Sequence, residues 1–134
     1  MNHVSLNFSN TFLGELKTDK ASVQIGQVDG ALSPYELLAG ALGSCLYATF
    51  LDVIHKMRLE FSTCTLDVVW EKREEVPTVL KTAHIKAVIN GADTKKSDKY
   101  ERAFKLATEY CSVYYTLSQV AEITWEIAIF EDVK

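Results

Sequence analysis

The chain has 134 residues, which is long enough for one domain to bury a hydrophobic core of its own. Its hydrophobic content of 48% and charged content of 24% are those of a globular protein and argue against disorder. The net charge of −4 argues against a nucleic acid or an anionic membrane as the main partner, because both require a concentrated cationic face.

The N-terminal part of the chain is predicted to form three short strands. Residues 3–9 alternate apolar and polar side chains, which is the period of a half-buried strand. Two further strands are expected around 12–17 and 21–28, separated by a polar turn. Residues 1–12 contain neither a basic leader nor a continuous apolar stretch, so we expect no signal peptide and a cytoplasmic protein.

A long apolar helix is predicted next. Ser33 is followed by Pro34 at the first helical position and by Glu36 three residues later, which is the pattern of a capping box. The helix is expected to extend to about Lys56, and residues 37–51 carry no formal charge. The apolar run is too short and too rich in small residues to favour a membrane span. Because the helix is apolar on nearly all sides, we expect it to be buried on nearly all sides.

Four further elements are expected: strands at 65–71 and 84–89, a helix at 97–110 and a strand at 123–129. The order βββ-α-ββ-α-β, with antiparallel hairpins and helices set apart from them, predicts a single α+β domain over residues 1–134 with an antiparallel sheet and a long buried central helix. A chain of this size has difficulty covering a helix that is apolar all round as well as its strands. We therefore expect a homodimer in which the helix is shared with the partner.

Three cysteines are present, Cys45, Cys64 and Cys111, at spacings of 19 and 47 residues. An odd number at these spacings is not a disulfide framework. No C-x-x-C or paired-histidine motif predicts a zinc site, and the three histidines are isolated from one another. We therefore expect reduced thiols and no metal.

Cys45 and Cys111 are the candidates for thiol chemistry. Cys111 lies where the second helix breaks into a new turn, and a short helix starting there would favour its thiolate. Cys45 lies about 11 residues into its helix, roughly 16 Å from the N-terminus, so its reactivity has to come from a neighbour that the fold supplies. The alternative is that both are small core hydrophobes, which is the interpretation favoured for Cys64.

The segments SPYELLAGALGSC, at residues 33–45, and YCSVYYTLSQVAEI, at residues 110–123, resemble the OsmC/Ohr family of thiol peroxidases. The order of elements is similar to that family across essentially the whole chain. The resemblance implies an intertwined α+β homodimer with two sites at its interface. It also implies that Cys45 attacks an organic hydroperoxide and that Cys111 resolves the sulfenic acid as an intramolecular disulfide. An external dithiol reductant then regenerates the enzyme, and no cofactor is needed.

The chain also departs from that family. Tyr35 stands where the branches with peroxidase activity have a catalytic glutamate, and Glu36 lies one place later, about 100° around the helix. Tyr35 and Glu36 are therefore the candidates for the position nearest the family's acid. Those branches also use an N-terminal arginine, whereas here no arginine precedes Arg58. Ser112 replaces the proline of the family's common C-P-V sequence, and the pattern resembles a less characterised branch.

The missing arginine has a chemical consequence. An arginine beside a thiol lowers its pKa, so we expect Cys45, in an apolar pocket without one, to have a raised pKa. Lys17 and Lys20 are candidates for a substitute charge, although exposed positions on a hairpin are the favoured interpretation. His55 lies ten residues along the helix, roughly 15 Å from Cys45, and cannot substitute within one subunit.

Two functions are compatible with this pattern. The first is a thiol-dependent peroxidase that reduces organic hydroperoxides in oxidative stress defence. The alternative is a non-catalytic protein of the same family that binds a small apolar molecule at the dimer interface, with structural or redox-sensing cysteines. Five aromatic residues are expected either to line an apolar pocket or to pack in the core: Tyr35, Tyr47, Phe50, Tyr114 and Tyr115.

Overall fold

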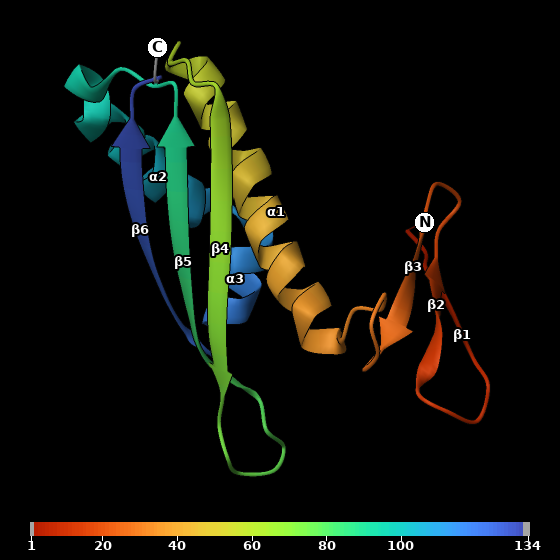
Figure 1. Ribbon diagram of the computed structural model, residues 1–134. Coiled ribbons are helices and arrows are strands. Elements are labelled where there is room, and N and C mark those ends of the chain that lie inside the picture. Colours follow the sequence, from red (N-terminus) through yellow and green to blue (C-terminus); the bar gives the residue numbers. More distant parts are fainter. Residues whose placement is uncertain (1, 133–134) are drawn as a thin grey trace. The chain divides into compact units, whose positions relative to one another are not determined.

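The computed structural model describes residues 2–132. The chain divides into two compact units, the first ending at Leu38 and the second beginning at Ala39. In the first unit, β1 (Ser5–Phe8), β2 (Leu13–Lys17) and β3 (Ser22–Gly26) form an antiparallel sheet in the order β1-β2-β3 (Figure 1). The three strands predicted for this part of the chain are confirmed.

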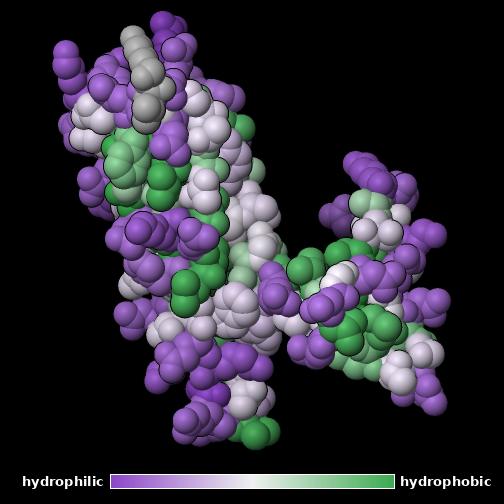
Figure 2. Space-filling view, viewed as in Figure 1, coloured by the Kyte–Doolittle hydropathy of each residue, from purple (hydrophilic) through white to green (hydrophobic). Residues whose placement is uncertain are grey.

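The first sheet has very little buried core. Ile25 and Gly26 are the buried residues of its strands, and every residue of β1 is exposed. Figure 2 shows apolar residues gathered on this sheet, which leaves an uncovered apolar surface. The exposed large apolar side chains of the first unit are Val4, Leu6, Phe8, Phe12, Leu13, Val28 and Leu32.

The helix α1 (Pro34–Lys56) begins with the predicted capping box. The backbone N–H of Ser33 donates to Glu36 Oε1 at 2.8 Å, and the backbone N–H of Glu36 donates to Ser33 Oγ at 3.4 Å. These reciprocal bonds satisfy two N–H groups that the start of a helix leaves without a carbonyl partner. At the other end, Lys56 lies in the last turn, where the helix dipole favours a positive charge.

Within one chain, α1 buries one face only, so a single chain does not supply the expected burial on nearly all sides. Leu42, Leu46, Phe50 and Ile54 recur every four residues along that face and are at most 1% exposed. The opposite side of the helix, which includes Ala48, is exposed. Other elements of the second unit pack against one side of α1, and no described element covers the rest.

The second unit contains a mixed sheet of β4 (Thr63–Lys72), β5 (Leu80–Asn90) and β6 (Glu122–Phe130), with β5 in the centre (Figure 1). β4 and β5 form the expected antiparallel hairpin. β6 runs parallel to β5, with Trp125 opposite Ile85, so the expectation of a wholly antiparallel sheet is wrong for this strand. A parallel neighbour requires a crossover connection, and the helices between β5 and β6 supply it.

That crossover consists of the 3₁₀ helix η1 (Thr94–Lys96), α2 (Ser97–Tyr110) and α3 (Ser112–Ser118). The bounds of α2 match the prediction, and α3 is the short helix considered possible after the break. Figure 1 shows these helices on the same face of the second sheet as α1. The buried residues of α2 are the predicted apolar face: Tyr100, Ala103, Phe104 and Ala107.

Aromatic contacts join the helices to one another and to the sheet. The ring of Phe50 on α1 lies 6.1 Å from that of Phe61 and 5.5 Å from that of Phe104 on α2, measured between centroids. The ring of Phe104 lies 5.0 Å from that of Trp125 on β6. Tilted aromatic pairs at these separations are favourable beyond the area that they bury. The position of α1 in the second unit is therefore fixed by packing around Phe50.

By length and composition α1 could cross a membrane, since this 23-residue helix contains an 18-residue stretch with a mean hydropathy of 1.7. Length alone does not exclude a span, contrary to the expectation from its sequence. The core helix of a globular protein passes the same test, however, and Leu46 and Phe50 are fully buried against the rest of the second unit. We therefore interpret α1 as a core helix.

The capping box makes a testable prediction about stability. Ser33→Ala removes the acceptor for the backbone N–H of Glu36 and should lower the free energy of unfolding by about 1 kcal/mol. Glu36→Gln keeps a side-chain oxygen for the N–H of Ser33 and should change the melting temperature little. Urea denaturation measures both. Ser44→Ala, inside the same helix, is the matched control, and an equal loss for Ser44→Ala would contradict the capping role.

Candidate active site

The second unit brings Cys45 and Cys111 together, although 66 positions separate them in the sequence. Cys45 lies on α1 and is partly exposed, whereas Cys111 lies between α2 and α3 and is completely buried. The two thiols are close enough for each to shift the pKa of the other, and both are free rather than joined as a disulfide. The pair of cysteines chosen from the sequence is therefore also a pair in space.

The break between the two crossover helices positions Cys111. This residue has an extended backbone conformation, with φ −73° and ψ 119°, so α2 ends at Tyr110 and α3 begins at Ser112. The backbone N–H of Cys111 still donates to the carbonyl of Ala107 at 2.9 Å, and its own carbonyl accepts from Tyr115 at 3.0 Å. Cys111 is thus both the C-cap of α2 and the N-cap of α3.

The first turn of α3 surrounds the Cys45 sulfur with hydrogen-bond donors. Ser112 Oγ lies 3.9 Å from Cys45 Sγ, within hydrogen-bonding reach for a large sulfur atom. The pKa of Cys45 is lowered from its ordinary value, mainly by the backbone N–H of Val113 and then by the Cys111 thiol, with further contributions from Ser112. Together these hydrogen bonds outweigh the opposing effect of burial.

The expectation that Cys45 has a raised pKa is therefore wrong. It assumed that only a cationic side chain could favour the thiolate inside an apolar environment. In this structure backbone N–H groups and a hydroxyl perform that task, and neither leaves a recognisable charge in the sequence. The neighbour that Cys45 required is the segment that follows Cys111.

Cys111 has the opposite character. Burial raises the pKa of its thiol, and the neighbouring Cys45 raises it further, while the backbone N–H of Tyr114, 3.4 Å from Cys111 Sγ, partly offsets both effects. The expectation that the start of a short helix would favour the Cys111 thiolate is wrong, because burial outweighs the hydrogen bond. At neutral pH Cys45 is the better nucleophile of the two, and Cys111 remains protonated.

Cys64 is separate from this pair. It lies on β4, packs against the hydrophobic core, and has its pKa raised to about 11 by burial. A thiol with such a pKa is almost fully protonated at neutral pH and is a poor nucleophile. The interpretation of Cys64 as a structural residue is consistent with this environment.

The other candidates for the acid and the charge belong to the first unit. Tyr35 and Glu36 lie in the first turn of α1, and Lys17 and Lys20 are exposed residues at and beyond the end of β2. The N–H of Ser33 lowers the pKa of Glu36, so the capping box contributes stability at neutral pH and loses it as the pH falls through that pKa. The roles of these residues toward Cys45 stay predictions.

The aromatic residues expected around a ligand do not form one pocket. Phe50 is fully buried in the core, Tyr115 is 65% exposed, and the hydroxyl of Tyr114 donates to the carbonyl of Ile123 at 3.3 Å. Of these five residues, only Tyr47 lines either of two cavities along α1. Core packing is therefore the better explanation for Phe50 and Tyr114.

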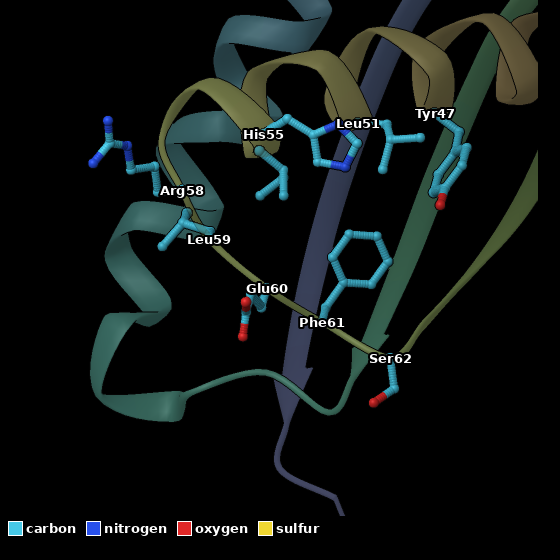
Figure 3. Close-up of a pocket in the computed structure, with 9 residues that line it drawn as sticks. Tyr47, Leu51, His55, Arg58, Leu59, Glu60, Phe61 and Ser62 are labelled. Carbon is cyan, nitrogen blue, oxygen red and sulfur yellow. The ribbon is translucent and has the colours of Figure 1, made fainter.

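Two open cavities lie along α1, and neither includes Cys45 or Cys111. The larger, of about 790 Å³, lies at the C-terminal end of the helix, where Tyr47, Leu51 and His55 face Phe61 (Figure 3). His55 is therefore part of another cavity and not of the thiol pair. The smaller, of about 440 Å³, lies between α1 and β4 and is lined by Ala39, Gly40, Gly43, Ser44, Tyr47, Leu66 and Val68.

Sequence reasoning missed Ser112 and Val113 as partners of Cys45. The only signal was the departure from the C-P-V pattern at Ser112, which by itself does not say where the serine points. Among residues 2–132 there is also no group of three or more His, Cys, Asp or Glu side chains that could hold a metal ion.

The different environments of the three thiols predict their order of alkylation. With iodoacetamide at pH 7, Cys45 should react first because its thiolate is favoured, and Cys64 should react last because its pKa is about 11. Mass spectrometry of the cysteine-containing peptides measures each rate. In urea the three alkylation rates should converge, which would show that the differences come from the fold and not from neighbouring residues in the sequence. A folded protein in which Cys64 reacts as fast as Cys45 would contradict these environments.

Comparison with known proteins supports a family assignment. The family described as "OsmC-like protein" matches residues 26–126. Protein YhfA of Escherichia coli K12 is 31% identical over 116 residues, covering 85% of this chain and 86% of YhfA. A hypothetical protein from Aquifex aeolicus VF5 is 29% identical and superposes with a TM-score of 0.80 over 96% of this chain and 97% of its own.

Solved structures of low identity share the fold. An organic hydroperoxide resistance protein OsmC from Legionella pneumophila has a TM-score of 0.73 at 12% identity, covering 96% of this chain and 98% of that one. OhrB of Bacillus subtilis, also an organic hydroperoxide resistance protein, has a TM-score of 0.66 at 14% identity, covering 95% and 98%. With its α+β fold and the match over residues 26–126, the chain belongs to the OsmC-like protein family.

Proposed function

We propose that this protein is a thiol-dependent peroxidase that reduces organic hydroperoxides in oxidative stress defence. The observation that carries the proposal is the Cys45–Cys111 pair, in which the more exposed thiol has a lowered pKa and the buried one a raised pKa. A nucleophile favoured as thiolate beside a second, protonated thiol is the arrangement that a two-cysteine peroxidase needs. Membership of a family with organic hydroperoxide resistance proteins is consistent with it.

The chemistry proceeds in two steps. The Cys45 thiolate attacks the terminal oxygen of the hydroperoxide, the O–O bond breaks, and the leaving alkoxide takes a proton to become an alcohol. Cys45 is then a sulfenic acid. Cys111, after losing its proton, attacks Cys45 Sγ, the S–O bond breaks, and water leaves as the disulfide forms. One hydroperoxide and two thiols thus give one alcohol, one water and one disulfide.

The cycle requires an external dithiol, which reduces the disulfide by thiol–disulfide exchange and is itself oxidised. This requirement favours the cytoplasm, where reducing systems keep thiols reduced. The chemical step needs no cofactor. Tyr35 and Glu36 are the proposed residues nearest the position of the family's acid, and Glu36 already has a structural partner in Ser33.

We also propose that the protein acts as a homodimer. The strands of the first sheet expose a row of apolar side chains, and the exposed side of α1 carries small residues such as Ala41, Ser44 and Ala48, which allow close approach of a second chain. Burying such surfaces against a second copy is favourable at roughly 25 cal/mol per Å² of apolar area. The resemblance to an intertwined family of dimers points to the same partner.

A second candidate function has a specific observation in its favour. The cavity between α1 and β4 is lined mainly by small or apolar residues, such as Gly43, Leu66 and Val68, and does not contain the cysteines. A protein that binds a small apolar molecule there would need no thiol chemistry, and its cysteines would be structural or redox-sensing. The reactivity of the thiols toward hydroperoxides separates this function from the peroxidase.

Stoichiometric oxidation tests the peroxidase. One equivalent of cumene hydroperoxide added to the reduced protein should consume two thiols per chain and leave Cys64 free, because Cys64 is protonated and apart from the pair. Cys111→Ser should stop at the sulfenic acid, which dimedone traps, and should over-oxidise with excess hydroperoxide. Cys45→Ser should not react. Folded protein whose thiols survive for hours would instead favour the binding function.

The dimer has its own test. Sedimentation at low micromolar concentration should show a dimer, and Leu6→Asp should weaken it, because Leu6 is a 53% exposed apolar residue of the first sheet. Val76→Asp is the matched control, since Val76 is 90% exposed outside the regular strands. A folded monomer for the wild-type protein, or equal effects of the two substitutions, would overturn the proposed assembly.

A further inference from the structure

The Cys45 sulfur has a side-chain neighbour on α3 that the proposed mechanism has not yet used. Ser112 Oγ lies 3.9 Å from Cys45 Sγ, and a hydroxyl is a donor that can point its hydrogen at a thiolate. Each cause that lowers the pKa of Cys45 in one chain is a hydrogen bond, and no lysine or arginine is among them. Within the second unit, the groups that favour the Cys45 thiolate are therefore neutral donors.

We propose that Ser112 is a catalytic residue whose hydroxyl donates a hydrogen bond to Cys45 Sγ and holds that sulfur as a reactive thiolate. The catalytic role of Ser112 rests on the proposed peroxidase function. The same hydroxyl is in reach of the oxygen that Cys45 acquires as a sulfenic acid, because that oxygen is bonded to the same sulfur. Ser112 thus remains beside the reacting atom through the first step.

The backbone around Ser112 is fixed well enough to aim its hydroxyl. The carbonyl of Ser112 accepts from Thr116 Oγ1 at 2.8 Å, and the preceding carbonyl, of Cys111, accepts from the N–H of Tyr115 at 3.0 Å. The two bonds tie the N-cap and the first residue of α3 to the turn that follows them. Rotation about the Cα–Cβ bond of Ser112 is then the main freedom that its hydroxyl retains.

The identity of the residue matters twice at this position. Serine offers Cys45 both a hydroxyl and a backbone N–H, and both favour the thiolate. The proline that the related C-P-V sequences carry has neither donor, because its nitrogen bears no hydrogen. A serine in this place is therefore chemically suited to a chain whose N-terminal part lacks an arginine.

Three substitutions separate the two donors. Ser112→Ala removes the hydroxyl and keeps the N–H, Ser112→Pro removes both, and Ser112→Thr keeps both. The pH dependence of Cys45 alkylation by iodoacetamide, followed by peptide mass spectrometry, reports the pKa of that thiol. Alkylation of Cys45 at pH 7 should be roughly threefold to tenfold slower in Ser112→Ala, with the midpoint shifted to higher pH. Ser112→Pro should shift it further, and Ser112→Thr should restore it.

A matched control lies in the same helix. Ser118 Oγ donates to the carbonyl of Tyr115 at 2.7 Å, so Ser118→Ala removes a comparable hydrogen bond from α3 and should leave the Cys45 profile unchanged. Thermal unfolding of each variant verifies that it is folded. An unchanged Cys45 profile in folded Ser112→Ala, or an equal shift in Ser118→Ala, would overturn the proposal.

Failure of this inference and failure of the proposed function are distinguishable. Alkylation requires no hydroperoxide, so its pH profile decides whether Ser112 holds the Cys45 thiolate. The rate of dimedone trapping after cumene hydroperoxide is measured in the same variants and should fall in Ser112→Ala by a factor similar to that of alkylation. If Ser112→Ala shifts the alkylation profile but hydroperoxide oxidises no thiol, Ser112 still favours the Cys45 thiolate. The same result would contradict both the catalytic role of Ser112 and the peroxidase.

Discussion

A thiol in the interior of a long helix cannot be activated by its own helix, because the backbone N–H groups around it are already bonded to carbonyl groups one turn earlier. Cys45 is in that situation, so its chemistry depends on donors from another element. The extended backbone at Cys111 supplies them by ending α2 and starting α3 beside the sulfur. Had α2 continued without interruption, the N–H groups of Ser112 and Val113 would have been engaged in helical hydrogen bonds. The break in the helix is therefore as important to the site as either cysteine.

The packing of the second unit serves this arrangement. The ring of Phe104 on α2 packs against Phe50 of α1 on one side and Trp125 of β6 on the other. These two contacts fix α1 against the crossover helices and the crossover helices against the sheet. Cys111 is completely buried and belongs to the same core, whereas Cys45 retains access to solvent. An accessible nucleophile beside a protected second thiol divides the two tasks that the proposed peroxidase requires. Desolvation raises one pKa, and hydrogen bonds lower the other.

Much of the fold was predictable because its signals are local. The capping box at Ser33 and Glu36, and the apolar spacing of Tyr100, Ala103, Phe104 and Ala107, can be recognised without knowing any long-range contact. The direction of β6 was not predictable in this way, since the alternation of Ile123 and Trp125 is the same for a parallel and an antiparallel strand. The one-sided burial of α1 within a single chain was not predictable either, because hydropathy measures what a helix can bury and not what covers it. The contact of Ser112 with Cys45 joins residues 67 positions apart, and no local pattern encodes it.

The hydrogen bonds at Cys45 also bear on the reverse half of the proposed cycle. A disulfide carries no charge, so the donors of Ser112 and Val113 stabilise the reduced, thiolate form more than the oxidised form. Preferential stabilisation of the reduced form raises the reduction potential of a cysteine pair. The break after α2 therefore favours both attack on the oxidant and return of the enzyme by a mild electron donor.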